Sequence, residues 1–265
     1  MSMSNVITNA RDTARIVRSD VRDHLASRRS ATTTLAAEEQ ELVERLRADG
    51  YVVIPGYWPR DRALEMRNRL EAYLSDGESR DFENGAYLRF WDNRAYDEGV
   101  RRFYHVDKEV GELTEYRNDP MIMRVVEAYY GRPFYSAALV FQHNTKSNAN
   151  TRYHHVDAFS KEFKSFLYLD DVDEGNGPFA YIPRTHRSHA RRILKQLRQG
   201  SGATGFTDEE LKSVISNEVR LTGAAGTLIL ADVRGFHRGT PQLDRSRSVI
   251  VNYMYDSPDE VWPDR

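Results

Sequence analysis

The sequence predicts a mainly β fold with flanking helices: a double-stranded β-helix, the cupin-like jelly roll. Two observations support this. Segments with helical periodicity dominate the first half of the chain, and from residue 134 onward short runs rich in β-branched and aromatic residues alternate with Gly, Pro, Asn and Asp. Short strands in series, separated by turn residues, are typical of sandwiches and barrels.

Three amphipathic segments precede the β region and are expected to form helices. The first one ends at Asp49-Gly50, a typical helix stop, and the β-type run Tyr51–Pro55 follows it. The expected helices are Leu35–Arg47, Pro59–Leu74 and Pro120–Tyr130, the last closed by Gly131.

The β region contains a series of short runs that we expect to be strands. These are Phe134–Phe141, Lys164–Leu169, Phe179–Ile182, Thr227–Leu230 and Ser248–Tyr255. Two helical stretches interrupt the series between residues 186 and 217. The stretch Gly85–Asn118 is aromatic and charged without a clear period, so we expect a long loop with short pieces of structure there.

The length of 265 residues fits one large domain. We expect a flexible N-terminal arm at residues 1–36, which is polar and rich in Arg, Ser, Thr and Ala. Residues 37–265 are expected to form a single jelly-roll domain with N-terminal helices and a helical insertion at about 186–217. Hydrophobic residues make up 40% of the chain, which is enough for a core and excludes general disorder.

Composition narrows the possible functions. A formal net charge of −2 argues against a nucleic-acid coat or a membrane-surface protein, because both need a basic excess. The chain has no cysteine, so any metal must be bound by His and carboxylate side chains. Residues 1–29 mix Arg with Asp and lack an apolar core of signal-peptide length, so we expect a soluble, cytoplasmic protein.

The segment Tyr153-His-His-Val-Asp157 carries the main chemical signal. Side chains alternate along an extended strand, so His155 and Asp157 point to one side and His154 to the other. A third ligand could come from His237, near the start of the last strands. Two His and one carboxylate leave positions of an octahedral ion open, as in non-haem iron(II) oxygenases, although His-x-Asp alone also arises by chance.

Two arginines follow His237, in the segment Arg245-Ser-Arg247-Ser. A guanidinium can bind a carboxylate through two parallel hydrogen bonds, and it stays charged at any working pH. Arg247 opens an apolar strand run, so its side chain could project into a barrel. Arg245 lies in the preceding turn with the same strand parity, so geometry alone does not separate the two, and both could be ordinary turn arginines.

Several motifs together resemble the phytanoyl-CoA dioxygenase family, in the family's order and over about residues 38–255. They are Asp49-Gly-Tyr-Val-Val-Ile-Pro55 before a helix, His155-Val-Asp157, Ser165–Pro178, Ile182-Pro-Arg-Thr-His-Arg187, and His237-Arg-Gly-Thr-Pro241 up to Arg247. The chain departs from the family where Arg184-Thr185 replaces Gly-Ser, and after His237, where the turn is one residue shorter. Neither departure changes a candidate ligand, so they bear on substrate identity.

The resemblance implies an enzyme that uses Fe(II), 2-oxoglutarate and O2. His155, Asp157 and His237 would bind the metal and form the catalytic centre, Arg247 would bind 2-oxoglutarate, and Gln142 would be a further polar contact of this co-substrate. Relatives that transfer halide have a small residue in place of the carboxylate. Because Asp157 is present, the resemblance disfavours a halogenase.

The implied reaction is hydroxylation of an unactivated C–H bond of a small molecule, with release of succinate and CO2. The same cofactors also support desaturation, epoxidation or cyclisation, and a jelly roll that binds a ligand without turnover is the alternative from another class. A cationic run that begins at Arg184 is compatible with an anionic or carrier-linked substrate, although such runs are more often solvated helix faces. Nucleic acid and membrane are not expected as partners, and the oligomeric state is not predicted.

Overall fold

The structure is a computed structural model that describes residues 7–11, 13–14, 17–18, 34–90, 98–146, 152–157, 162–187, 190–200 and 202–258. Most of the expected N-terminal arm, residues 1–36, lies outside the described residues, so its flexibility stays a prediction. The described residues 7–11, 13–14 and 17–18 are helical. Among the described helices, none combines the length and apolar character needed to cross a membrane.

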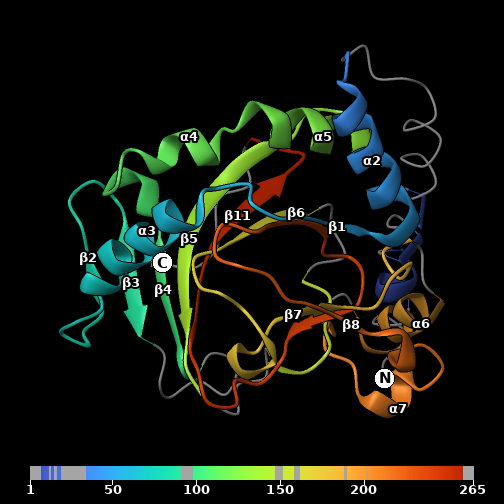
Figure 1. The fold of residues 1–265 in the computed structure, drawn as a ribbon. Helices are drawn as coiled ribbons and strands as arrows, with labels where there is room; N and C mark the ends of the chain where they lie inside the picture. The colour runs from blue at the N-terminus through green and yellow to red at the C-terminus, as the bar shows by residue number, and fades with distance from the viewer. Residues whose placement is uncertain are drawn as a thin grey trace.

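Two antiparallel sheets face each other (Figure 1). Among the described residues the larger sheet has the strand order β1-β9-β6-β11-β5-β4-β3-β2, and the smaller has the order β10-β7-β8. The larger sheet consists of β1 (Tyr51–Ile54), β2 (Arg80–Asp81), β3 (Tyr87–Phe90), β4 (Val100–Tyr104), β5 (Tyr135–Asn144), β6 (Glu162–Tyr168), β9 (Leu228–Asp232) and β11 (Arg247–Tyr255). The smaller sheet consists of β7 (Phe179–Tyr181), β8 (Val219–Leu221) and β10 (His237–Gly239).

Helices cover the outer face of the larger sheet, away from the smaller one (Figure 1). They are α2 (Ala37–Asp49), α3 (Arg60–Ala72), α4 (Leu113–Arg117) and α5 (Pro120–Tyr130), with the short 3-10 helix η1 (Val106–Lys108) before α4. Leu46, Met66 and Val125 from these helices form one buried cluster with Phe141 and Ile250 from the strands. Each such fully buried side chain contributes roughly 1.5–3 kcal/mol, so this cluster holds the helices on the sheet.

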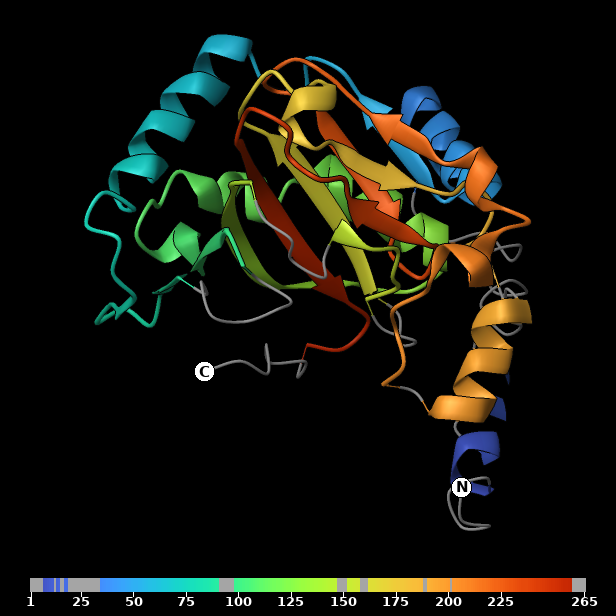
Figure 2. The ribbon, with the colours of Figure 1, turned by 90° about the horizontal axis from the view of Figure 1, so that it is seen from below.

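A second cluster fills the space between the two sheets. In β11, Ile250 and Met254 belong to the cluster under the helices, whereas Val249 and Tyr253 belong to the cluster between the sheets. This is the alternation expected of a strand. Arg247 shares the parity of Val249 and Tyr253, so its side chain points between the sheets. Figure 2 shows β11 running between β5 and β6, at the centre of the larger sheet.

The turn from α2 into β1 requires the glycine that the sequence places there. Gly50 has a φ of 89°, in the left-handed region that suits glycine. A Cβ atom at this position would lie 2.5 Å from both His186 Nδ1 and the Tyr181 hydroxyl. The absence of a side chain therefore lets this turn pack against Tyr181 at the end of β7 and against His186, which follows this strand.

The helices expected from periodicity are confirmed: α2, α3 and α5 lie within two residues of the predicted bounds. The short pieces of structure expected at Gly85–Asn118 are present, but the expectation of a long loop is wrong, because β3, β4 and α4 lie in this stretch and the two strands extend the larger sheet beyond β5. Charged residues occupy paired strand positions here, with Arg89 opposite Arg102. Arg89 is stabilised by Asp81 at 2.6 Å. Such charges hide the apolar alternation from which strands are predicted.

The segment between β7 and β8 carries most of the remaining helical structure. It contains α6 (Ala190–Gln199), α7 (Asp208–Leu211) and the 3-10 helix η4 (Ile215–Asn217). A further 3-10 turn, η3 (Glu174–Asn176), precedes β7. Figure 1 places α6 and α7 together at the end of the molecule beyond β8.

Candidate metal centre

His155 and His237 lie directly opposite each other on antiparallel backbone. The His155 N–H donates to the His237 carbonyl at 2.9 Å, and the His237 N–H donates to the His155 carbonyl at 3.0 Å. Their ring centroids are 4.5 Å apart. The His237 ring also lies 5.4 Å from the ring of Phe179, a member of the cluster between the sheets. Both histidines therefore project into the space between the sheets.

Asp157 brings a carboxylate to the same point. Its Oδ2 lies 3.0 Å from His237 Nε2, and its Oδ1 lies 3.7 Å from His155 Nε2. One candidate ligand atom from each of the three residues lies within 4.8 Å of the others, the one such His and carboxylate group found in the described part of the chain. Neighbouring ligands about 2.1 Å from one ion lie roughly 3 Å apart, so the geometry suits a shared metal.

The backbone sets which ring nitrogen faces this point. His155 Nδ1 lies 2.8 Å from the Tyr153 carbonyl, and His237 Nδ1 lies 2.9 Å from the Gly235 carbonyl. A carbonyl can only accept, so Nδ1 carries the proton in both contacts and Nε2 keeps its lone pair. Metal-binding histidines typically use their second nitrogen in this way. The donor set therefore fits a divalent metal.

Charges around the triad favour its metal-binding protonation states. Burial and the positive charge of a neighbouring His237 lower the pKa of His155 to about 4, so this imidazole is neutral at pH 7. Burial alone would raise the pKa of Asp157, but Lys164 and His237 hold it well below its ordinary value. A neutral His155 imidazole and the ionised Asp157 carboxylate would therefore face a metal ion.

A buried ion pair lies beside the triad on β6. Lys164 Nζ is 2.8 Å from Asp157 Oδ2 and 3.1 Å from Glu162 Oε1. The ammonium also lies 4.1 Å from the centroid of the Tyr253 ring. Burial would lower the pKa of Lys164, but the two carboxylates raise it well above its ordinary value. Lys164 is therefore a cation inside the fold.

A second charged group lies on the side of the His155 and His237 backbones that faces away from the triad. His154 points away from the triad, as the strand alternation predicts, and its Nε2 lies 2.6 Å from Glu218 Oε2. Arg238, the neighbour of His237, donates to both oxygens of Glu218 at 2.8 Å. Burial would raise the pKa of Glu218, but the hydrogen bonds from His154 and Arg238 lower it to about 2. The ionised Glu218 side chain thus links the segment that carries His154 to the segment that carries Arg238.

Arg247 is 5% exposed and lies between the sheets. It donates to the Gly177 carbonyl, and it interacts electrostatically with the Tyr168 side chain. The Tyr168 hydroxyl also accepts the Phe179 N–H at 3.1 Å, and the Phe179 ring lies against His237. Burial lowers the pKa of Arg247, although a guanidinium still keeps its charge at pH 7. Its buried Nε has no hydrogen-bond partner among the described residues, so it can donate to a ligand.

Gln142 also faces the interior, with the parity of Val140 on β5. Its side-chain oxygen accepts a hydrogen bond from Arg102 Nε at 3.1 Å, and its side-chain nitrogen donates to Asn144 at 2.8 Å. Its role as a contact of the co-substrate stays a prediction.

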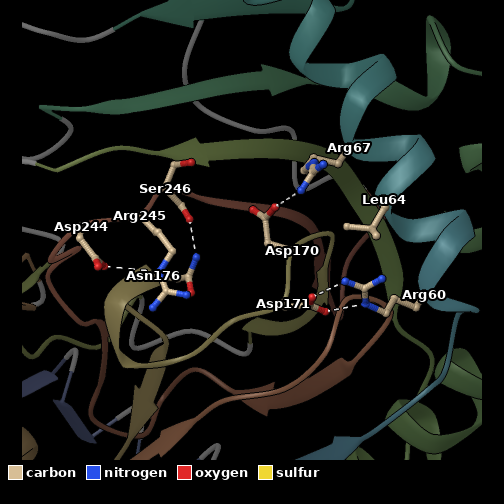
Figure 3. A pocket seen from close by; sticks show the side chains of 9 residues that line it. All are labelled: Arg60, Leu64, Arg67, Asp170, Asp171, Asn176, Asp244, Arg245 and Ser246. Carbon is tan, nitrogen blue, oxygen red and sulfur yellow. Dashed lines mark hydrogen bonds and ion pairs between the residues drawn. The ribbon is translucent and has the colours of Figure 1, made fainter.

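Arg245 faces a different region from Arg247. It lines an outer pocket of about 570 Å³ (Figure 3), and its side chain is 53% exposed and bound to Asp173 at 2.7 Å. Ion pairs cross this pocket: Arg67 lies 2.8 Å from Asp170. The lining is Arg60, Leu64, Arg67, Asp170, Asp171, Asn176, Asp244, Arg245 and Ser246, without any residue of the triad. The pocket is therefore separate from the candidate metal centre.

The cationic run of the insertion is largely engaged within the protein. Arg192 is fully buried and donates to the Arg234 carbonyl at 3.1 Å. Lys195 lies 2.8 Å from Glu210 and 4.6 Å from the Phe206 ring centroid. The run therefore forms neither a simple solvated helix face nor a group of unpaired cations. Binding of an anionic or carrier-linked substrate by this enzyme stays a prediction.

Sequence reasoning did not single out Lys164, Glu162 or Glu218. A signal for the first two was present, because the segment Glu162-Phe-Lys-Ser-Phe places two charged residues at alternate positions of an apolar strand. Charged side chains on the buried face of a strand usually have a specific partner. Glu218 gave no such signal, since its partners are distant in the sequence.

Residues 46–248 match the family model of phytanoyl-CoA dioxygenase (PhyH). The non-heme α-ketoglutarate-dependent carbocyclase SnoK from nogalamycin biosynthesis has a similar structure, with 16% identity, a TM-score of 0.60 and 86% of each chain covered. HygX from Streptomyces hygroscopicus, solved with nickel, 2-oxoglutarate and hygromycin B, has 14% identity and a TM-score of 0.58, with 86% of this chain and 90% of HygX covered.

EctD from S. alaskensis is also similar, with 15% identity, a TM-score of 0.59, and 83% of this chain and 77% of EctD covered. A comparison with curated proteins gave no match. The structural similarities show the fold, which is the cupin-like double-stranded β-helix predicted from the sequence. Because the family match covers most of the sequence, the chain belongs to the phytanoyl-CoA dioxygenase family and is a non-haem enzyme that depends on iron and 2-oxoglutarate.

Proposed function

We propose that the enzyme hydroxylates an unactivated C–H bond of a small-molecule substrate. Iron(II) with 2-oxoglutarate supplies the oxidising chemistry: O2 provides one oxygen atom to the product and one to succinate, and CO2 is released. The observation that carries the proposal is the convergence of His155, Asp157 and His237, with Arg247 buried in the same interior. The proposal places this reaction in the cytoplasm, where 2-oxoglutarate is available as a metabolite.

In this proposal the triad binds iron through one face. His155 and His237 would offer Nε2, because their Nδ1 protons are held by backbone carbonyls. Asp157 would offer a carboxylate oxygen, and Lys164 would remain beside the carboxylate. Three protein ligands leave room for the co-substrate and O2, as in other 2-His-1-carboxylate sites.

Arg247 would bind the carboxylate of 2-oxoglutarate that lies away from the metal. Three properties of Arg247 support this. Its side chain is buried, its Nε–H has no hydrogen-bond partner among the described residues, and it lies near Tyr168, which contacts Phe179 and through it the His237 ring. A buried guanidinium can hold a carboxylate by two parallel hydrogen bonds and so fix the co-substrate's direction. Gln142 is proposed as an additional polar contact from β5, the strand that pairs with β11 in the same sheet.

The same residues could serve desaturation, epoxidation or cyclisation. The fold of this chain is shared with SnoK, which is described as a carbocyclase, and with SnoN, which is described as an epimerase. Ring formation is therefore the second candidate. Product mass separates the two, because hydroxylation adds one oxygen atom, whereas desaturation and oxidative ring closure remove two hydrogens.

The test begins without a substrate. Anaerobic protein should bind Fe(II) and then 2-oxoglutarate with a weak visible charge-transfer band, and the band should be lost in His237→Ala. A panel of free and coenzyme A-linked small molecules is then screened for succinate release, and products are analysed by mass after reaction in isotopically labelled O2. A wild-type protein without the band would contradict the cofactor assignment, and a product without the label would contradict hydroxylation.

A further inference from the structure

We propose that Lys164 is a positioning residue for the metal centre: held by Glu162, it fixes the Asp157 carboxylate in the direction from which it can bind a metal. The proposal rests on the proposed function of the triad. It assigns a role to two buried charged residues of β6 that no step of the reaction requires.

The contacts of Asp157 show why it needs such a partner. Asp157 lies in a bend outside the named strands, and its N–H donates to the Val233 carbonyl at a long 3.3 Å. Its carboxylate lies 3.0 Å from His237 Nε2, but those are two candidate ligand atoms, and a metal bound between them would replace this contact. Lys164 Nζ donates to Asp157 Oδ2 at 2.8 Å. A bound metal would leave this hydrogen bond intact.

Lys164 is itself held in place. Its side chain is 7% exposed, Glu162 Oε1 lies 3.1 Å from its Nζ, and the Tyr253 ring lies 4.1 Å away. Glu162 and Lys164 are two positions apart on β6, so both project from the same face. These contacts hold the ammonium in one position, from which it donates a hydrogen bond to Asp157.

Charge explains why the lysine has an acidic partner. An isolated ammonium beside the triad would repel a divalent ion and oppose metal binding. Glu162 lies close enough to offset that charge, so Lys164 can orient Asp157 without a large electrostatic penalty. Stability alone does not require this pair, because apolar replacements of buried ion pairs are often neutral or stabilising. The proximity of the pair to Asp157 instead indicates a role at the metal centre.

The experiment compares metal affinity in variants with matched charge. The double variant Glu162→Gln/Lys164→Met removes the pair and leaves the net charge unchanged, so a change in affinity reports orientation. Anaerobic protein is titrated with Co(II), whose visible d–d bands report both occupancy and coordination. Residues that orient metal ligands typically change affinity by about 10- to 100-fold, so we expect weakening of that size and an altered band shape.

The control variant is Glu209→Gln/Lys212→Met, which removes an exposed ion pair on the surface of the insertion. It should bind Co(II) like the wild type. If Glu162→Gln/Lys164→Met does not fold in urea-unfolding measurements, Glu162→Gln/Lys164→Gln serves instead, because it also leaves the net charge unchanged. The glutamine at position 164 keeps a polar donor but is one atom shorter than lysine, so it should not reach Asp157 and the variant should show the same weakening.

Wild-type affinity and band shape in a folded Lys164 variant would overturn the proposal. Failure of the proposed function looks different: the wild-type protein itself would then bind no Co(II), or would bind it equally well after His237→Ala. Weakened binding in the Lys164 variants with a normal control would establish the positioning role without any knowledge of the substrate.

Discussion

His154 and Arg238, the sequence neighbours of His155 and His237, bind the same carboxylate on the outer face of the smaller sheet. His154 Nε2 lies 2.6 Å from Glu218, and Arg238 donates to both of its oxygens at 2.8 Å. On the inner face, the backbones of His155 and His237 pair directly. The distance between the two candidate ligand histidines is thus set both by backbone hydrogen bonds and by the ionised side chain of Glu218 behind them.

The first prediction concerns this link. Glu218→Gln removes the charge with little change of shape and should lower the free energy of unfolding by about 1–3 kcal/mol, because two cationic or polar partners lose a charged acceptor. Urea unfolding of the metal-free protein measures it. Glu174→Gln, which breaks an exposed pair with Arg220, is the control and should cost under about 1 kcal/mol. Equal effects at both positions would show that Glu218 is an ordinary surface acid.

The second prediction is a pH dependence. The pKa of Glu218 is lowered to about 2 in the folded protein, against about 4.3 for an unfolded chain. The unfolded state therefore takes up the proton first, and the contribution of Glu218 to stability is complete above about pH 4.3 and lost as the pH falls through about 2. The stability difference between wild type and Glu218→Gln should shrink across this window. A constant difference at every pH would refute the ionic link.

Strand alternation and turn residues were enough to place much of the site. His155 and Asp157 were expected on one face because a strand alternates, and Arg247 was expected to point inward because it opens an apolar strand. Both expectations depend on local geometry, which the sequence contains. The family resemblance added the order of the motifs and so linked His237 to the other two, although it lies 80 residues from Asp157.

Other parts depended on contacts that no local pattern encodes. β3 and β4 were missed because Arg89 and Arg102 stand at strand positions where an apolar residue would have marked the alternation. Arg192 belongs to the cationic run of the insertion, a pattern more often found on a solvated helix face, yet it is fully buried and donates to the Arg234 carbonyl. The carbonyl that Arg192 binds lies 42 residues away in the sequence, and such a contact becomes visible in the structure alone.

The third prediction concerns the carboxylate of the triad. Asp157→Ala should abolish substrate hydroxylation and weaken Fe(II) binding, because the triad loses its one carboxylate ligand and its negative charge. The measurements are succinate release, product yield and Fe(II) affinity. Asp208→Ala provides the control, since the Asp208 side chain is 80% exposed. Unchanged succinate and product formation in Asp157→Ala would mean that the triad is wrongly assigned.

The structure gives a physical reason to choose between the two arginines. Arg247 begins β11 and is 5% exposed between the sheets, whereas the Arg245 side chain is 53% exposed and bound to Asp173 in the outer pocket (Figure 3). A carboxylate held at Arg247 would be shielded from water, which strengthens its interaction with the guanidinium. A carboxylate at Arg245 would compete with Asp173 and with solvent. We therefore propose Arg247, and not Arg245, as the residue that would bind 2-oxoglutarate.

The last prediction tests this assignment. Breaking a buried ion pair by removing one partner costs about 3–5 kcal/mol, so Arg247→Ala should weaken 2-oxoglutarate binding by some hundredfold or more. Arg247→Lys should restore it in part, because an ammonium keeps the charge but lacks the two-pronged geometry. Arg245→Ala is the matched control and should leave the affinity nearly unchanged. Anaerobic titration of 2-oxoglutarate against the Fe(II)-loaded variants, followed by the visible band, measures all three without a substrate. Weak binding in Arg245→Ala together with normal binding in Arg247→Ala would reverse the assignment, and it would move the co-substrate from the interior to the outer pocket.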